Sequence, residues 1–398
     1  MKERLFNEID KIKVELEELS RNIHKNPELA FEEHKSAAFT MELLKKHGFE
    51  IEFPAGGLET AFKATYNGCG DGPTIAYMAE YDALPEMGHA CGHNLIAMVS
   101  TGAAIGLSKL MDKLPGKLVL MGTPAEELGG GKILMIQDGA FEGIDFALMA
   151  HPSTRNKIGG KSLAITDVTV EFFGKPAHSS APENGINALS AVLHTFYLID
   201  AARTAMPVKT NINGIINSGG VAANIIPEYA KCTFAVRGAS VKDLKKVLEM
   251  VKNAIRTAES FTGATAKVHI DVLYAESYEN IAMSESYKKH MADMGVEYTY
   301  IDPSEKQGST DTANVQIKLP AIQPGVKVCE PEIKGHTLEF RDACVTDKAH
   351  EAILKAAKAL AATGYELFTD EKLREEVMKE FKEAVPVYTD EDTAVEPY

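Results

Sequence analysis

The sequence predicts an α/β fold: a mostly parallel sheet flanked by helices, with an inserted ferredoxin-like α+β domain. Between residues 74 and 152, short apolar strands alternate with helical segments, an order typical of a buried parallel sheet. From about residue 163 the order becomes strand–helix–strand–strand–helix–strand, which is the ferredoxin-like arrangement. At 398 residues, the chain is long enough for two domains with large apolar cores.

The first domain is predicted to begin with an amphipathic helix whose apolar stripe includes Leu5, Ile9 and Leu16. Further along, residues 95–111 have helical spacing, and Asn94 is placed to act as the N-cap of that helix. The apolar runs that predict strands of the sheet are residues 74–82, 117–127 and 145–152.

The inserted domain is predicted to span residues 163–278, so residues 1–162 and 279–398 together form the other domain. Within the insert, residues 240–261 predict a helix in which Ser240 and Asp243 form a variant capping box. After the insert, the chain returns to the first domain with a helix, a strand and a helical C-terminus rich in alanine and lysine.

Charge and composition exclude some classes of function. The formal charge of −15 argues against binding to nucleic acids or anionic membranes. No apolar run reaches the ~18 residues of a membrane span. The N-terminus has no apolar signal-peptide core, and the five scattered cysteines do not form a disulfide framework. These observations predict a cytoplasmic protein.

Cys91 and His93 form a C-G-H unit in the stretch "EYDALPEMGHACGHN", residues 80–94. Gly92 permits a sharp turn, so the thiol and the imidazole can point the same way. The unit alone leaves three interpretations open: a small buried cysteine, a nucleophilic Cys–His pair, or two metal ligands.

Further donors lie where apolar strands end. Asp82, Glu126, Glu127 and His151 all follow such strands, and ligands bind beyond the carboxyl ends of open sheets. Adjacent buried carboxylates repel each other unless a cation lies between them.

His336 also sits in a polar break just past an apolar segment, so the candidate ligands are Cys91, His93, Glu127, His151 and His336, with Asp82 close by. They suffice for two divalent ions about 3.5–4 Å apart. Thiolate, imidazole and carboxylate donors favour Zn²⁺ and also accommodate Mn²⁺ or Ni²⁺, so we expect hydrolysis by metal-activated water.

Seven motifs occur in order between residues 80 and 342, and together they carry a family resemblance. They are "EYDALPEMGHACGHN", "GTPAEELGGGK", "ALMAHP", "GKPAHSSAPENGINAL", "GGVAANIIPE", "GSTDTANV" and "GHTLEFRD". The chain resembles the aminoacylase/carboxypeptidase-G family of dinuclear metallopeptidases. Its branch is similar to the amidohydrolases of indole-acetyl-amino acids, hippurate and aminobenzoyl-glutamate, and to a sub-branch of cytosolic dipeptidases.

The resemblance implies a hydrolase of N-acyl amino acids or dipeptides that acts through a metal-bridging water. It implies that the five candidate residues bind the metal ions and that Glu126 is the general base. It also implies that Asp82 orients one of the metal ligands. It makes the insert a lid and homodimerisation domain, in which His178 reaches the partner's site to stabilise the oxyanion. The implied substrate-binding residues are His178, Asn224, Ser309 and Asp311.

Some features depart from the family pattern or keep alternatives open. Asn94 stands where many members have Asp, and "GHTLEF" replaces the more usual "HSP.F" around the ligand histidine. Glu80 and Glu86 are weaker candidates than Asp82 for a role in the site. The rival functions are a cysteine hydrolase that pairs Cys91 with His93 or His89, and a non-catalytic binding protein on the same fold.

Overall fold

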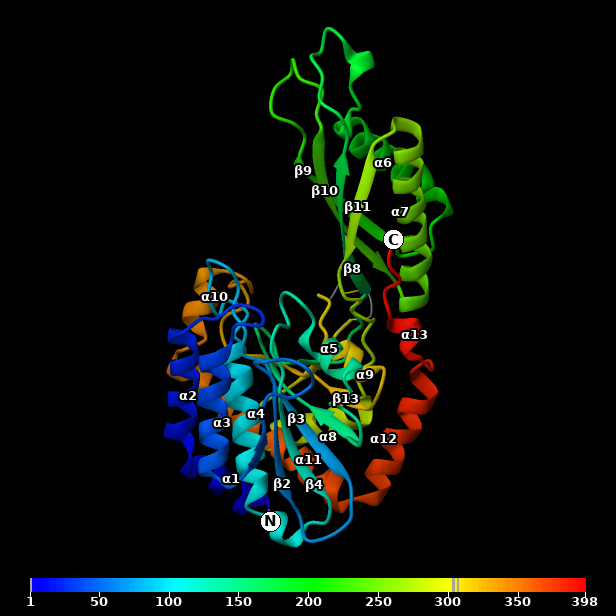
Figure 1. Ribbon diagram of the computed structural model, residues 1–398. Coiled ribbons are helices and arrows are strands. Elements are labelled where there is room, and N and C mark those ends of the chain that lie inside the picture. The colour runs from blue at the N-terminus through cyan, green and yellow to red at the C-terminus, as the bar shows by residue number, and fades with distance from the viewer. Residues whose placement is uncertain (1, 303–304, 306–307) are drawn as a thin grey trace. The chain divides into compact units, whose positions relative to one another are not determined.

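The computed structural model describes residues 2–302, 305 and 308–398, which group into two compact units (Figure 1). Unit 1 consists of Met1–Lys161 and Ser277–Val387, and unit 2 consists of Ser162–Glu276 and Tyr388–Tyr398. Within the described residues, no helix combines the length and apolar character that crossing a membrane requires.

Unit 1 is built on a mixed, mostly parallel sheet with the strand order β1-β2-β4-β3-β5-β13. The neighbours β4, β3, β5 and β13 run parallel, and β1 and β2 are antiparallel additions at one edge. This arrangement confirms the predicted α/β class. The strands are β1 (Glu50–Glu52), β2 (Phe62–Asn67), β3 (Thr74–Ala79), β4 (Lys117–Gly122), β5 (Phe146–Leu148) and β13 (Ala321–Ile322).

Both faces of this sheet are buried, which explains the continuous apolar runs in its central strands. Along β3, Tyr77 points into one apolar cluster and Met78 into another. The Tyr77 hydroxyl donates to the carbonyl of Leu360 at 2.9 Å, and a Cβ on Gly364 would lie 2.2 Å from that hydroxyl. Only glycine therefore permits so close an approach of α11 (Asp347–Thr369) to the sheet.

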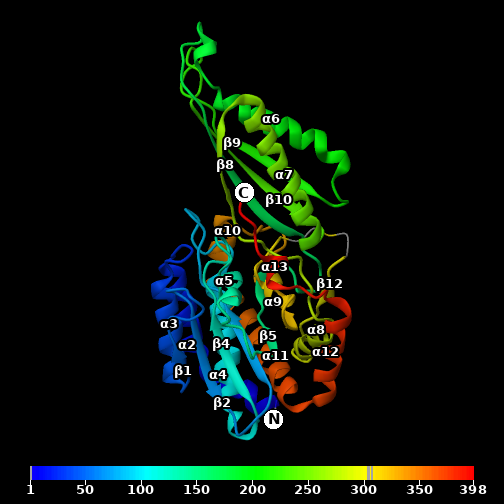
Figure 2. The ribbon, with the colours of Figure 1, turned by 45° about the vertical axis from the view of Figure 1, so that its right-hand side comes forward.

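Helices cover the two faces unequally. The first face carries α4, α11 and the N-terminal helices, whereas α5 and α9 contribute to the second core (Figure 2). The helices of unit 1 are α1 (Lys2–Lys11), α2 (Lys13–Lys25), α3 (His34–Lys46), α4 (His93–Ser108), α5 (Gly131–Gln137), α8 (Ile281–Ala292), α9 (Thr312–Gln316), α10 (Leu338–Ala343), α11 (Asp347–Thr369) and α12 (Glu371–Ala384). A small second sheet has the order β12-β7-β14-β6, with β6 (His151–Ser153), β7 (Lys157–Ile158), β12 (Thr299–Tyr300) and β14 (Gly325–Lys327).

Unit 2 has the predicted ferredoxin-like element order. Its antiparallel sheet has the order β11-β8-β10-β9, and burial alternates along β8 and β10 because α6 and α7 cover one face. Ser240 accepts a hydrogen bond from the Asp243 amide at 3.2 Å, which confirms it as the N-cap of α7. The elements are β8 (Ala164–Phe173), α6 (Ala188–Ala202), β9 (Asn211–Ser218), β10 (Tyr229–Gly238), α7 (Val241–Thr262), β11 (Thr265–Ile270) and, near the C-terminus, α13 (Asp390–Thr393).

The C-terminal tail differs from the sequence expectation, which placed all of residues 279–398 in the first domain. Residues Tyr388–Tyr398 belong to unit 2. The buried Lys252 ammonium of α7 donates to the carbonyl of Glu396 at 3.0 Å, and the Tyr398 hydroxyl donates to Glu259 at 2.5 Å. The tail supplies the hydrogen-bond acceptors that the buried Lys252 ammonium needs. No local sequence pattern in the tail predicts that it pairs with Lys252.

Candidate metal centre

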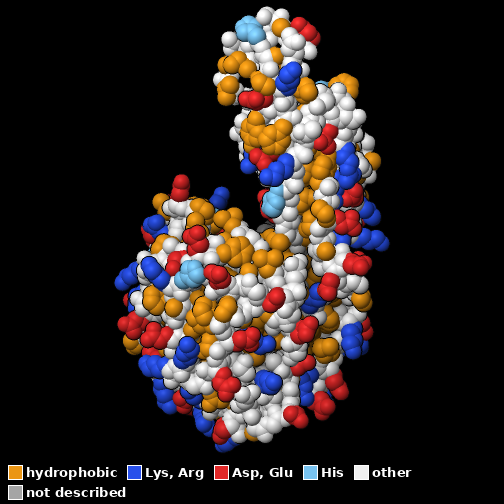
Figure 3. All heavy atoms as spheres, in the orientation of Figure 1, with side chains coloured by type: hydrophobic (Ala, Val, Ile, Leu, Met, Phe, Trp, Pro, Cys, Tyr) orange, Lys and Arg blue, Asp and Glu red, His pale blue; other side chains and the backbone are white. Residues whose placement is uncertain are grey.

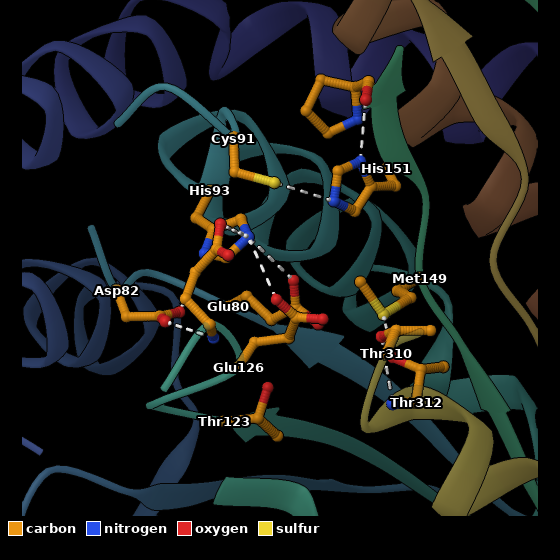
Figure 4. A network of polar contacts seen from close by, with 12 residues as sticks. Glu80, Asp82, Cys91, His93, Thr123, Glu126, Met149, His151, Thr310 and Thr312 are labelled. Carbon is orange, nitrogen blue, oxygen red and sulfur yellow. Dashed lines mark hydrogen bonds and ion pairs between the residues drawn. The ribbon is translucent and has the colours of Figure 1, made fainter. Parts of the chain in front are cut away.

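The candidate residues gather beyond the carboxyl ends of three parallel strands. Glu80 and Asp82 follow β3, Glu126 and Glu127 follow β4, and His151 follows β5. Because β4, β3 and β5 are parallel neighbours, their carboxyl ends meet at one edge of the sheet. Figure 4 shows the side chains of Glu80, Glu126, His93 and His151 converging at this edge.

A left-handed turn places Cys91 and His93 at the start of α4. Gly92 has a φ of 84°, and a Cβ there would lie 2.7 Å from the side chain of Pro152. The expectation that Asn94 caps this helix is wrong, because Gly92 is the N-cap and Asn94 lies inside the helix. The Asn94 amide is buried and donates to Ser20 and to the carbonyl of Cys344.

Asp82 orients the imidazole of His93. Its Oδ1 is 2.8 Å from His93 Nδ1, and its Oδ2 accepts from the amide of Glu127 at 2.9 Å. Burial acts to raise the pKa of Asp82, but His93 and the Glu127 amide outweigh it, so the pKa lies below its usual range. This contact leaves His93 Nε2 directed at the centre, as in carboxylate–histidine–metal arrangements.

Among the described residues, three groups of donor atoms lie close enough to hold a cation, with all atoms of a group within 4.8 Å of one another. The groups are Cys91, His93 and His151; Cys91, Glu127 and His336; and Glu80, His93 and Glu126. Cys91 belongs to two of them. All five ligands expected from the sequence are thus brought together, and Glu80 is added to them.

The distances within these groups fit metal coordination. Cys91 Sγ lies 3.6 Å from His151 Nε2, and Glu127 Oε1 lies 3.6 Å from His336 Nε2. In a tetrahedral site with metal–sulfur bonds of about 2.3 Å and metal–nitrogen bonds of about 2.0–2.1 Å, such pairs are about 3.3–3.6 Å apart. In addition, His93 Nε2 and Glu127 Oε1 are buried and have no hydrogen-bond partner among the described residues. A cation bound in each of their groups would satisfy these atoms, so the residues fit metal ions.

The pKa shifts of Cys91 and His151 suit ligands. Burial lowers the pKa of His151 to about 4, so its imidazole is neutral at physiological pH and free to bind a cation. Burial raises the pKa of the Cys91 thiol well above its usual range, despite the nearby His93. A nucleophilic cysteine requires the opposite shift, and a bound cation is what converts such a thiol to a thiolate.

A strained turn brings Glu126 and Glu127 to the same centre. Ala125 has a φ of 60°, and its amide donates to the buried carboxylate of Glu33 at 2.9 Å. Burial raises the pKa of Glu126 well above its usual range, and the negative charges of Glu80 and Asp311 raise it further. A carboxyl group with a raised pKa is suited to accepting and returning a proton at neutral pH.

The remaining expected residues lie in different surroundings. His336 sits on a loop with a φ of 60°, and its side chain is 53% exposed. Ser309 is half-buried. Asp311 was expected to line the pocket, but its side chain is fully buried and bonded to Lys132. His178 and Asn224 are exposed on neighbouring loops of unit 2, where the Ser179 amide donates to the Asn224 carbonyl at 2.9 Å.

Sequence reasoning underrated Glu80 and missed Lys132. Glu80, like Asp82, comes directly after the apolar strand β3, and this position could have identified it as a candidate site residue. Lys132 follows three glycines at the start of α5, where lysine is usually exposed. Its full burial depends on Glu80 and Asp311, which are distant in the sequence.

Comparison with known proteins identifies the family. Residues 163–261 match the peptidase dimerisation domain of the M20 peptidases. An Xaa-Arg dipeptidase of Mus musculus is 37% identical, covering 96% of this chain and 92% of the relative. The chain belongs to the M20 family of peptidases. Another M20 relative is a p-aminobenzoyl-glutamate hydrolase chain of Escherichia coli, which is 25% identical over 92% of each chain.

Solved structures share the M20 fold. An aminohydrolase from methicillin-resistant Staphylococcus aureus has a TM-score of 0.76 at 22% identity, covering 93% of this chain and 100% of that one. A dinuclear metal-binding M20 peptidase of Bacillus subtilis has a TM-score of 0.62 at 20% identity, covering 87% and 98%. Membership in the M20 family confirms that the protein is an enzyme, a metal-dependent hydrolase of amide bonds.

Proposed function

We propose that this M20 enzyme hydrolyses the amide bond of a dipeptide or an N-acyl amino acid at a centre of two divalent ions. The observation that carries this proposal is the pair of donor groups that share Cys91. One ion would be held by Cys91, His93 and His151, and the other by Cys91, Glu127 and His336. The donor set favours Zn²⁺ and also accommodates Mn²⁺ or Ni²⁺.

When bound, the ions supply an activated water at neutral pH and polarise the substrate carbonyl. In this proposal, Glu126 takes the proton from the attacking water and returns it to the leaving amine. Asp82 holds His93 in the tautomer whose Nε2 faces the centre. Ser309 contributes to substrate binding from the loop that precedes α9.

His178 is assigned to the oxyanion. The Ser180 amide donates to His178 Nδ1 at 3.2 Å, which leaves Nε2 as the ring nitrogen available to donate. An Nε2–H on an exposed loop can donate to the negative charge that develops on a substrate carbonyl. On the family resemblance, this donor would serve the site of a second copy of the chain, with Asn224 as a substrate contact on the neighbouring loop.

The same proposal includes a homodimer formed through unit 2. β9 is an edge strand with Ile215 61% exposed and Ile216 45% exposed, and Val221 follows at 91%. Figure 3 shows hydrophobic side chains gathered over this part of unit 2. An unpaired apolar strand edge is suited to pairing with a second copy, and the matching family model is a dimerisation domain.

Dipeptides with C-terminal arginine are the first substrates to test, because relatives at 37% and 35% identity are named Xaa-Arg dipeptidases. A cytoplasmic location belongs to the proposal as well. All five cysteines lie in described parts of the chain and none is in a disulfide, which supports a reducing compartment.

The test is hydrolysis by purified protein after dialysis against a chelator, with Zn²⁺, Mn²⁺ or Ni²⁺ then restored. The substrates are Xaa-Arg dipeptides and N-acetyl-, N-benzoyl- and indole-acetyl-amino acids. We expect activity to disappear with the chelator and to return with a metal. Elemental analysis should find two ions in the wild type and fewer in Cys91→Ser, whereas Cys232→Ser in unit 2 should keep both. Two ions in Cys91→Ser would refute the shared ligand.

A further inference from the structure

Glu80 is held in a buried cluster of charges beside the proposed metal centre. Its Oε1 accepts from the Lys132 ammonium at 2.5 Å, and the same ammonium donates to Asp311 Oδ1 at 2.7 Å. The Lys132 amide also donates to Asp311 Oδ2 at 2.9 Å. All three side chains are fully buried.

The charges of this cluster do not cancel. Two carboxylates face one ammonium in a region from which water is excluded, so Lys132 alone does not balance both of them. An uncompensated buried charge is strongly unfavourable unless another cation shares it. Both Asp311 oxygens bond to Lys132, and so does Glu80 Oε1. Glu80 Oε2 is therefore the oxygen of these two carboxylates that Lys132 does not contact, and it lies beside His93 instead.

Glu80 Oε2 points at His93. Within the part of the chain that the structure describes, this oxygen is buried without a hydrogen-bond partner, as is His93 Nε2, and the two atoms are 3.4 Å apart. In a tetrahedral site with bonds of about 2.0–2.1 Å, oxygen and nitrogen ligands are about 3.3–3.4 Å apart. Figure 4 shows the carboxylates of Glu80 and Glu126 both directed at the His93 ring.

We propose that Glu80 is a further metal ligand of this enzyme, binding through Oε2 the ion that His93 binds through Nε2. Lys132 and Asp311 are positioning residues, since Lys132 occupies Oε1 and so fixes the direction of Oε2. The inference rests on the proposed function, because it requires an ion at His93. It adds an anionic oxygen donor to the set of thiolate, imidazole and carboxylate ligands.

The test compares metal binding by the wild type and Glu80→Gln, a variant that keeps the shape of the side chain and an acceptor for Lys132. Affinities are measured by competition with a chromophoric chelator, and the Co²⁺-loaded protein is examined by visible absorption. We expect one of the two ions to bind at least about 10-fold more weakly and the Co²⁺ spectrum to change. Glu279→Gln is the control, because Glu279 bonds to Ser284 at the start of α8 and should leave both readouts unchanged.

If Glu80→Gln does not fold, the neutral triple variant Glu80→Gln/Lys132→Met/Asp311→Asn replaces it, with the same expected loss of affinity. Two unchanged affinities together with an unchanged Co²⁺ spectrum would overturn the assignment of Glu80 and leave the proposed function intact. A wild-type protein that binds no ion would overturn both. The two failures are therefore distinguishable.

Discussion

Replacing Lys132 with methionine should strongly destabilise unit 1. The change removes the ammonium that lies 2.5 Å from Glu80 and 2.7 Å from Asp311, while a side chain of similar length keeps the apolar packing. All three side chains are fully buried, so both carboxylates would lose their cation without gaining water. Removing one partner of a buried ion pair typically costs about 3–5 kcal/mol.

The assay is urea unfolding of the metal-free protein followed by far-UV circular dichroism, because the chain contains no tryptophan to serve as a fluorescent probe. Lys348→Met is the matched control: Lys348 is 68% exposed in its pair with Glu330, and such surface pairs contribute little to stability. The triple variant Glu80→Gln/Lys132→Met/Asp311→Asn should recover most of the lost stability, since it buries no net charge. A loss below about 1 kcal/mol in Lys132→Met would refute the reasoning.

Three other substitutions test Glu126 as the general base, the contact between His290 and Glu366, and the homodimer formed through unit 2. Glu126→Gln should lower kcat by about 10²–10⁴-fold with both ions still bound, and unchanged turnover would remove Glu126 as the base. The contact with His290, whose Nε2 lies 3.2 Å from Glu366 Oε1, lowers the pKa of Glu366 to about 2. Its stabilisation is therefore present above pH 4.5 and lost as the pH falls through about 2. The Tm difference between wild type and Glu366→Gln should shrink across that window, and a constant difference would contradict the assignment. Ile215→Lys on the β9 edge should give a monomer by light scattering where the wild type is a dimer, and a monomeric wild type would contradict the interface.

The strands and their polar ends could be predicted from the sequence because both depend on local pattern. The apolar runs that became β3, β4 and β5 are each followed by a candidate ligand, and parallel pairing brings those ligands together. His336 could also be singled out, because it lies in a polar break just past an apolar segment, although its loop has no periodic pattern.

The features that could not be predicted from the sequence depend on contacts between segments that are distant in the sequence. Lys132 pairs with Glu80 and Asp311, which are 52 and 179 residues away in the sequence, and no local pattern encodes such a cluster. Asn94 has the residue type of an N-cap, but the left-handed Gly92 starts the helix earlier and leaves the amide to bond Ser20. In both cases tertiary packing overrode the usual preference of the residue type.

The attachment of residues 388–398 to unit 2 offers a means of observing motion in this enzyme. Residue 2 belongs to unit 1 and residue 398 to unit 2, so the two ends of the described chain report on different bodies. A donor and an acceptor fluorophore attached at these ends would convert any change in the distance between the two ends into a change of energy transfer. Neither label would require a substitution near the ligands, and the absence of tryptophan removes a source of background emission.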